Sequence, residues 1–453
     1  MKKSAEVDML NGTLWDKIPR FALPVAATAV LEQLFNAADL MVVGSFTGEI
    51  STIAVAAVGA NSAIINLILN LFIGIALGVN VVIANAIGRE DEHDAQCAVH
   101  TAVAIAMSGG FIVAVLGELL AAPLLNVLHV PAEVLPYALQ YLRIYLVGLP
   151  AIFLYNFEAA IFRSTGKTQV PLKVLAFSGI LNVVLNLFFV IGIGRNVDGV
   201  AAATVCSNII SAGVLFYLLL RERSYIQVTV AGLKFDQKSM YKIFQIGLPS
   251  GIQNGVFAVA NIVIQTAINS LGTTVMAASS AAFNIEIIAY YVMNAFGQAC
   301  TTFVGQNYGA RQLDRCYRIF QVALLEDIAV SLLTISLILY SGRWLLSLFN
   351  REPAVIELGY LRLAIILCSY IFSMLYDVMS GYLRGFGISL APAVLTMLGV
   401  CGTRIAWVYV IFPFDRTFRT ILLAYPVSLS FTAILIFLAL LYYRPSKRPM
   451  KGN

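Results

Sequence analysis

Long apolar stretches, separated by short polar segments, follow one another through nearly the whole chain. Each is about 20 residues or longer, which is enough for a helix to cross a hydrocarbon core of ~30 Å. The pattern predicts an all-α polytopic membrane protein with twelve transmembrane helices. The expected spans are residues 18–44, 52–86, 96–120, 135–162, 169–193, 199–221, 242–269, 275–305, 317–342, 354–382, 388–413 and 418–443. The first seventeen residues lack an apolar core and are expected to form a short cytoplasmic lead.

Composition and charge agree with this pattern. Hydrophobic residues make up 60% of the 453 residues and charged residues 12%, with a mean hydropathy of +0.85, which excludes an ordinary soluble domain. With both termini in the cytoplasm, 21 of the 29 lysines and arginines fall on the cytoplasmic side and 7 on the other, with Arg404 inside a span. This distribution follows the positive-inside rule. We expect a multi-pass protein of a prokaryotic plasma membrane, and the net charge of +5 requires no nucleic-acid partner.

The two halves of the chain repeat each other. The segment IPRFALPVAATAVLEQ at 18–33 parallels IFQIGLPSGIQNGVFA at 243–258 and places Pro24 over Pro249. The segment LYNFEAAIFRSTGKTQVP at 154–171 recurs as LYDVMSGYLRGFGISLAP at 375–392, with a constant offset of 221 residues. Several such blocks in the same order indicate an internal duplication.

The duplication predicts two six-helix lobes. Because six spans return the chain to the side where it started, both halves insert with the same orientation, and their pseudo-twofold axis lies along the membrane normal. We expect an N-terminal lobe at 1–220, a cytoplasmic linker at 221–241 and a C-terminal lobe at 242–453. Two equivalent lobes suit transport by alternating access. Pro24 and Pro249 are candidate hinges, since proline removes a helix hydrogen bond.

Two carboxylates interrupt the first span, in the stretch LEQLFNAADLMVVG. Glu32, Asn36 and Asp39 follow one another at i, i+4 and i+7 and therefore share one face of a helix. A carboxylate that faces lipid costs roughly 2.5–3.5 kcal/mol, so this face is expected to meet protein or water. One interpretation is that the acids only hydrogen-bond to neighbouring helices. The other is that Asp39 is the coupling residue for a transported cation.

Polar side chains on the fifth and sixth expected spans can complete such a site. Asn182 and Asn186 are one helical turn apart, and Thr204 lies in the next span. Carboxylate, amide and hydroxyl oxygens in a dry interior can hold Na⁺, and a desolvated carboxylate can instead carry a proton. We predict a cation-coupling site formed by Asp39, Asn182, Asn186 and Thr204 together with Glu32. Within it, the candidate Na⁺ ligands are Asp39, Asn182 and Thr204.

Other polar residues within the spans are candidates for the lining of a substrate cavity. They are Asn36, Gln253, Asn254, Asn261, Gln265, Glu286 and Asp377. Amides in membrane helices also bond neighbouring helices, so both interpretations stay open. Arg404 is a candidate partner for Asp377 or Glu286.

Catalytic and metal-binding motifs are absent from the sequence. It contains no HExxH, no GxSxG and no phosphate-binding glycine loop, and its three histidines lack metal-ligand spacing. The six cysteines are scattered without CxxC pairs, as is typical of packing residues. We therefore expect a protein that is not an enzyme and has no cofactor, with Na⁺ or H⁺ as its coupling ion.

Several of these motifs together resemble the multidrug and toxic compound extrusion (MATE) family of secondary transporters. They are ALPVAATAVLEQLFNAADLMVVG, VGQNYGA, LNVVLNLFFVIGIGRNVDGVAAAT and the arginine-glycine turn that precedes Pro171 and Pro392. The resemblance implies twelve helices in two lobes and the export of varied, often cationic, organic compounds in exchange for Na⁺ or H⁺. It also implies ion-site roles for Asp39, Asn182 and Thr204.

The chain departs from many members of that family at Asn186, where they carry a second aspartate. The departure removes one negative charge from the expected ion site. A single carboxylate can still balance one Na⁺ or bind one proton, so coupling survives, but the choice of ion is left open.

The leading hypothesis is an antiporter that exports amphipathic, cationic organic compounds such as drugs and toxins. We expect a monomer whose partners are that organic substrate, a monovalent cation and membrane lipid. One alternative is a flippase for lipid-linked oligosaccharides, which would need several basic residues in its cavity, whereas only Arg404 lies well inside a span. Another is an ion channel or receptor, but a channel requires a continuous polar pore, and the carboxylates here are concentrated on individual helices.

Overall fold

The computed structural model describes residues 6–446. Lys2, Lys3, Lys447, Arg448 and Lys451, which contribute to the charge distribution above, lie outside the described residues. All regular structure between residues 6 and 446 is helical. Within that range eleven helices are long and apolar enough to span a membrane, and a bent pair of helices brings the number to twelve. The prediction of an all-α, multi-pass membrane protein with twelve spans is therefore confirmed.

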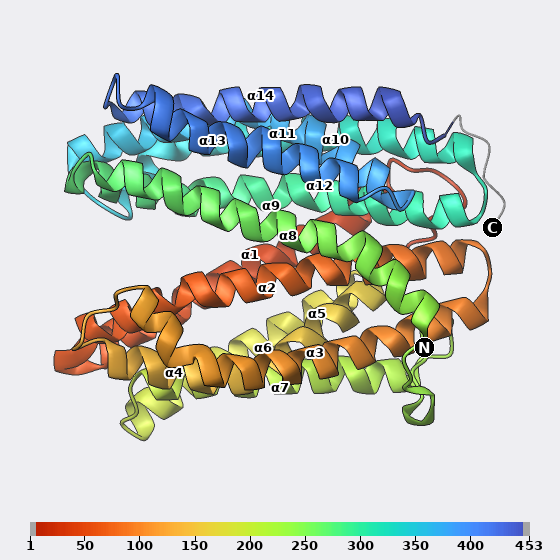
Figure 1. Cartoon of the computed structure of the whole chain (residues 1–453), viewed down its shortest axis with the longest axis horizontal. Coiled ribbons are helices and arrows are strands. Elements are labelled where there is room, and N and C mark those ends of the chain that lie inside the picture. The colour runs from red at the N-terminus through yellow and green to blue at the C-terminus, as the bar shows by residue number, and fades with distance from the viewer. Residues whose placement is uncertain (1–5, 447–453) are drawn as a thin grey trace. The chain divides into compact units, whose positions relative to one another are not determined.

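Two compact units make up the described chain. Unit 1 comprises Glu6 and Ala27–Gly247, and unit 2 comprises Val7–Ala26 and the residues from Leu248 onward. The helices that lie wholly in unit 1 are α2 (Ser51–Gly88), α3 (Glu92–Val127), α4 (Leu135–Val147), α5 (Leu149–Ser164), α6 (Gln169–Leu187) and α7 (Val197–Arg221). Those wholly in unit 2 are α9 (Thr273–Gly309), α10 (Leu313–Ser347), α11 (Pro353–Gly385), α12 (Leu390–Thr396), α13 (Thr403–Ala406) and α14 (Phe418–Tyr443). In Figure 1 the colours run from orange to yellow-green across α2–α7 and from green to blue across α9–α14.

Helices α1 (Lys17–Phe46) and α8 (Gln237–Asn269) each contribute residues to both units. The change of unit falls between Ala26 and Ala27 in α1 and between Gly247 and Leu248 in α8. Pro24 and Pro249 lie inside these helices, within a few residues of the change. A proline inside a helix removes one backbone hydrogen bond, so these turns are less braced than the rest of each helix. Their role as hinges stays a prediction.

The fourth expected span is bent. Helices α4 and α5 meet at 50° across Gly148, and Pro150 occupies the first turn of α5, where its missing N–H leaves no helix hydrogen bond unmade. A Cβ atom added to Gly148 would lie 2.6 Å from Val205 Cγ2, so glycine also allows the bend to approach α7. The uniform apolar pattern of 135–162 does not reveal this break.

Two other spans contain π-helical turns. The span of residues 169–193 ends in η2 (Phe188–Gly192), directly after α6. The span of residues 388–413 consists of α12, η4 (Met397–Gly402), α13 and η5 (Trp407–Ile411). Such turns widen the helix locally and are often found at functional sites.

The segment between α7 and α8 is anchored to α3. Thr229 N donates to His100 Nε2 at 3.0 Å, and Asp236 N donates to Thr101 Oγ1 at 3.0 Å. The Asp236 carboxylate accepts a hydrogen bond from Ser239 N at 2.7 Å and thereby caps the first turn of α8. Hydrogen bonds from the side chain and backbone of Ser239 lower the pKa of Asp236.

Candidate functional site

Asp39 on α1 is the centre of a buried polar network in unit 1. Asn186 Nδ2 donates to Asp39 Oδ1 at 2.5 Å, and Thr204 Oγ1 donates to Asp39 Oδ2 at 3.1 Å. Asn182 Oδ1 accepts from Asn186 Nδ2 at 3.2 Å, and Asn182 Nδ2 donates to Thr204 Oγ1 at 3.4 Å. The structure thus brings together four of the five residues expected to bind the coupling ion, and their role in coupling stays a prediction.

The local sequence explains how the three helices converge on Asp39. Asn182 and Asn186 are one turn apart on α6, so both amides point from the same face, and α6 packs against α7, which carries Thr204. A Cβ atom added to Gly179 on α6 would lie 1.8 Å from Phe35 Cε2 on α1. Helix α6 can therefore approach α1 this closely only because residue 179 has no side chain.

One oxygen of this network has no hydrogen-bond partner among the described residues. Both N–H groups of the Asn186 amide are used, one on Asp39 and one on Asn182, and Asn186 Oδ1 is buried without a hydrogen bond. Thr204 has a single hydroxyl proton, and both Asp39 Oδ2 and Val200 O, at 3.0 Å, lie within its reach. The Asp39 carboxylate is therefore stabilised by hydrogen-bond donors and not by a positive charge in this arrangement. Asn186 Oδ1, beside it, is an oxygen that could bind a cation.

The charge of the network suits a monovalent cation. Among residues 6–446 no group of three or more His, Cys, Asp or Glu side chains could hold a metal ion. Asp39 is the only carboxylate among the four bonded residues, and the other three supply two amides and a hydroxyl. One proton or one Na⁺ would balance the single negative charge.

Glu32 and Asn36 are placed differently from Asp39. Glu32 is partly buried and interacts electrostatically with Arg163 of α5, and no hydrogen bond joins it to the Asp39 network within the described chain. Asn36 is exposed. The shared helix face that the sequence indicates is real, but of the three side chains on it, only Asp39 reaches α6 and α7.

Tyr141 and Tyr145 on α4 are neighbours of Asp39 that the sequence analysis missed. Both are buried, and both lie within electrostatic range of the Asp39 carboxylate. Their spacing of one helical turn within an apolar span was the signal that could have revealed them, since a buried tyrosine hydroxyl needs a polar neighbour.

A second polar cluster, in unit 2, surrounds Asp377 on α11. Arg384, two turns further along α11, interacts electrostatically with Asp377, and its Nη2 donates to Gln253 Oε1 on α8 at 2.9 Å. Asp377 Oδ2 is buried and accepts no hydrogen bond from a described residue. The structure therefore joins two of the expected cavity residues, Gln253 and Asp377, through a guanidinium that the sequence analysis counted only as a cytoplasmic charge.

Two of the remaining candidates on α8 do not join this cluster. Asn261 and Gln265 are exposed, and Gln265 Nε2 donates to Asn269 Oδ1 at 2.7 Å on its own helix. Asn254 is partly buried. Whether these amides line a substrate cavity stays a prediction.

Glu286 on α9 forms a buried ion pair with Arg362 on α11. Arg362 Nη2 lies 2.6 Å from Glu286 Oε1, Nε lies 3.1 Å from Oε2, and both side chains are 4% exposed. Arg362 Nη1 also donates to Ser279 Oγ at 2.6 Å. The negative charge of Glu286 is therefore already balanced within unit 2.

The structure corrects one expectation about the arginines. Arg362, which was counted on the non-cytoplasmic side, is buried within α11, and its side of the membrane stays a prediction. Arg404 was a candidate partner for Glu286 or Asp377, but it donates to Ser428 Oγ at 3.2 Å and stands 4.2 Å from the centre of the Tyr425 ring. The apolar surroundings of Arg362 in YLRLAI gave no sign of the acid 76 residues away on α9.

The fold and these networks define a polytopic α-helical protein with buried polar networks between its helices, as is found in membrane transporters. The model of the MatE family matches residues 24–188 and again residues 249–410. The chain belongs to the MatE family of transporters, which confirms the predicted family and the prediction that the protein is not an enzyme. The same model matches each half once, as the internal repeat predicts.

Individual relatives agree with this assignment. The chain is 25% identical over 437 residues to the probable multidrug resistance protein YoeA of Bacillus subtilis, covering 94% of this chain and 93% of the relative. It is 26% identical over 398 residues to the probable multidrug resistance protein NorM of Thermotoga maritima, covering 86% and 84%. Its fold matches the outward-facing structure of a multidrug resistance MATE family transporter of the MOP superfamily with a TM-score of 0.90 at 20% identity, covering 99% of this chain and 100% of that one.

Proposed function

We propose that this protein is a cation-coupled exporter of amphipathic organic compounds, cationic ones among them. It works by alternating access, as a monomer in a prokaryotic plasma membrane, with both termini in the cytoplasm. The observation that carries the proposal is the single buried carboxylate of Asp39, held by one amide and one hydroxyl from two other helices. Relatives named as multidrug resistance proteins support drug-like organic molecules as the substrates.

The Asn186 amide gives the site two states. In one state an N–H group of this amide stabilises the Asp39 carboxylate, as in the structure. When a proton or Na⁺ binds to Asp39, that N–H donor is no longer needed, and a turn of the amide presents Oδ1, which now lacks a partner, to the bound cation. A proton on Asp39 would then be donated to Asn186 Oδ1. A Na⁺ would instead find oxygens from Asp39, Asn182, Asn186 and Thr204.

Helix α1 is the element that links this exchange to a larger motion. It carries Asp39 in unit 1 and Pro24 in unit 2, fifteen residues apart, which is about 22 Å along a helix. A change in the packing of α1 around Asp39 would therefore also change the position of the helix at Pro24. Pro249 occupies the corresponding place in α8.

The alternatives receive less support. A flippase for lipid-linked oligosaccharides needs unpaired basic groups for a pyrophosphate, but the buried Arg362 is paired with Glu286, and Arg384 stands beside Asp377. An ion channel would pass ions without an organic substrate. Flux measurements separate a channel from an exchanger.

The test is dye transport in proteoliposomes under an imposed Na⁺ gradient or an imposed pH gradient. We expect one of the two gradients to drive ethidium movement in wild type, and Asp39→Asn to abolish it. Glu118→Gln is the matched control, because it removes an acid from α3 of the same unit, beside Arg143 and outside the predicted ion site. Equal transport by wild type and Asp39→Asn would refute Asp39 as the coupling residue, and ion flux without a substrate would favour a channel.

A further inference from the structure

A large groove in unit 2 lies between the cytoplasmic ends of α10, α11 and α14. Its volume is about 1130 Å³, slightly more than is usual for a small-molecule site. The residues on its wall run from Phe372 to Tyr382 on α11 and from Ser430 to Leu441 on α14. At about 1.5 Å per residue these segments are roughly 15 Å long, which is half of a ~30 Å hydrocarbon core and therefore the depth of one leaflet.

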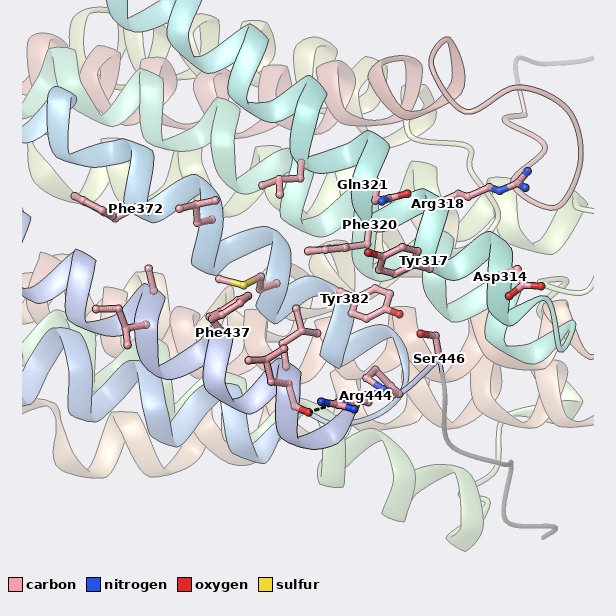
Figure 2. Close-up of a pocket in the computed structure, with 18 of the residues that line it drawn as sticks. Asp314, Tyr317, Arg318, Phe320, Gln321, Phe372, Tyr382, Phe437, Arg444 and Ser446 are labelled. Atoms are coloured by element: carbon pink, nitrogen blue, oxygen red, sulfur yellow. Dashed lines mark hydrogen bonds between the residues drawn. The ribbon is translucent and has the colours of Figure 1, made fainter.

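The chemistry of the wall changes along this length (Figure 2). Toward Phe372, on the side away from Arg444 and Ser446, the lining is apolar and includes Phe437. Leu375 and Ile434 also belong to the lining. At the other end, polar side chains gather around Tyr382, where α10 begins and α14 ends. They are Asp314, Tyr317, Arg318, Gln321, Arg444 and Ser446. A molecule that fits this groove has a long apolar tail and a polar head.

The charge at the polar end favours an anionic head. Two arginines, Arg318 and Arg444, stand against one acid, Asp314, and within residues 6–446 neither arginine forms an ion pair. Among the described residues, Arg444 Nε donates to one backbone carbonyl, Leu441 O, at 2.9 Å, and no other hydrogen bond of this guanidinium is found there. The sequence after Ser446 continues with Lys447, Arg448 and Lys451. Four basic residues directly after a transmembrane helix are a pattern typical of binding to anionic lipids.

We propose that this groove is a binding site for one anionic phospholipid of the cytoplasmic leaflet. The acyl chain lies along the apolar wall between α11 and α14, and the phosphate meets Arg318 and Arg444. A cationic drug does not fit the same site, because it would meet the two arginines. Unlike the Asp39 network, this groove lies wholly in unit 2 and takes no part in the proposed ion exchange.

Native mass spectrometry of the purified protein tests the site with phosphatidylglycerol and phosphatidylcholine that carry identical acyl chains. We expect wild type to retain phosphatidylglycerol preferentially. Since each arginine near an anionic leaflet strengthens binding by roughly fivefold, Arg318→Gln/Arg444→Gln should lower phosphatidylglycerol retention by about tenfold or more. The control Arg221→Gln/Arg223→Gln removes the same charge from the cytoplasmic end of α7 and should retain the preference. Equal losses in the two double variants would overturn the proposal.

The apolar part of the site has its own variant. Ile434 is 57% exposed and lines the groove, so Ile434→Trp fills it without disturbing the core, and Leu333→Trp, at a 62% exposed position of α10 outside the groove, is the matched control. Only the first should reduce retention. A phosphatidylglycerol with a photoreactive acyl chain should label α10, α11 and α14 of wild type, and labelling spread evenly over all helices would refute the site.

The same assay tests two other possible occupants of the groove, the chain after Ser446 and a free inorganic anion. If the chain after Ser446 filled the groove, removal of residues 447–453 would increase lipid retention, and that result would overturn the lipid as occupant. If the arginines formed only an anion site, inorganic phosphate would displace phosphatidylglycerol at millimolar concentration. We expect the truncation not to increase retention, and phosphate not to displace the lipid.

Discussion

Asn186 Nδ2 lies 2.5 Å from Asp39 Oδ1 and donates a hydrogen bond to it. A second carboxylate at this position would repel Asp39, whereas the amide stabilises it. The same amide also donates to Asn182 and leaves its own oxygen without a partner in the described chain. The site therefore carries one negative charge and an amide oxygen that accepts no hydrogen bond from the described residues. Both features can be tested by changing residue 186 alone.

The variant Asn186→Asp places a second carboxylate beside Asp39. Two carboxylates this close repel each other, and a bound cation relieves the repulsion, so we expect tenfold or more tighter binding of the coupling cation. Export should then be half-maximal at a lower Na⁺ concentration or at a higher pH, measured in proteoliposomes over a series of each.

Asn208→Asp is the control for the added charge. Asn208 lies on α7 and donates to Thr204 O at 2.8 Å, but it makes no hydrogen bond to Asp39. A similar change in cation dependence in both variants would show that added charge anywhere in unit 1 has this effect. The specific pairing of residues 39 and 186 would then be irrelevant.

The buried pair of Arg362 and Glu286 predicts a large stability effect. Removal of one partner leaves an uncompensated charge in the interior, so Arg362→Met or Glu286→Leu should each destabilise the protein by about 3–5 kcal/mol. The double variant replaces both charges by apolar groups and should be much more stable than the sum of the single effects implies. Thermal unfolding of the detergent-purified variants gives the ranking.

Arg343 and Glu357 provide the matched control for this pair. They are also bidentate, with Nε–Oε1 at 2.8 Å and Nη2–Oε2 at 3.1 Å, and Glu357 is on α11 as Arg362 is, but the side chains are 58% and 60% exposed. Arg343→Met should change the melting temperature little, because water solvates the remaining carboxylate. If Arg343→Met and Arg362→Met had equal effects, burial would not be the cause.

Much of the fold could be predicted from the sequence, because lipid leaves few alternatives. A span must be helical and apolar, and a polar side chain inside it must find a partner, so the length of the apolar stretches placed the spans. The i, i+4 spacing of Asn182 and Asn186 put both amides on one face, and the isolated acid of Asp39 needed just such donors.

The pairing of distant charges could not be predicted in the same way. Arg362 lies in an apolar segment, and nothing local indicates that Glu286, on another helix, is its partner. Glu32 and Asp39 are equivalent by spacing, but of the two only Asp39 hydrogen-bonds to α6 and α7 within the described chain. Side-chain partners on different helices follow from how the helices pack, and helix packing is not encoded in periodicity.

The prolines of α1 and α8 predict a selective loss of transport. Pro24→Ala and Pro249→Ala restore a backbone N–H to the helix and stiffen it near the point where the chain passes from one unit to the other. We expect each to lower the rate of dye export several-fold, while the melting temperature stays unchanged or rises.

Pro426 is the control for the chemistry of this substitution. It also lies inside a transmembrane helix, α14, but the whole of that helix belongs to unit 2. Pro426→Ala should leave export near the wild-type rate. If it slowed export as much as Pro249→Ala, a general effect of helix stiffness would account for both results.

The cap at the start of α8 predicts how stability depends on pH. Hydrogen bonds from Ser239 lower the pKa of Asp236, so the stabilisation due to its carboxylate is fully present above the ordinary aspartate value of about 3.9 and is lost as pH falls through the lower folded value. Asp236→Ala removes the cap, which costs about 0.5 kcal/mol, at the low end for such caps because the residue is partly exposed. The difference in melting temperature between wild type and Asp236→Ala should therefore be constant from pH 8 to about pH 4 and shrink below it.

Asp236→Asn keeps an acceptor without the charge and should lose less stability at neutral pH. A difference that widens on acidification, or one that vanishes already near pH 6, would mean that this carboxylate does not cap α8 in the way the Ser239 contact indicates.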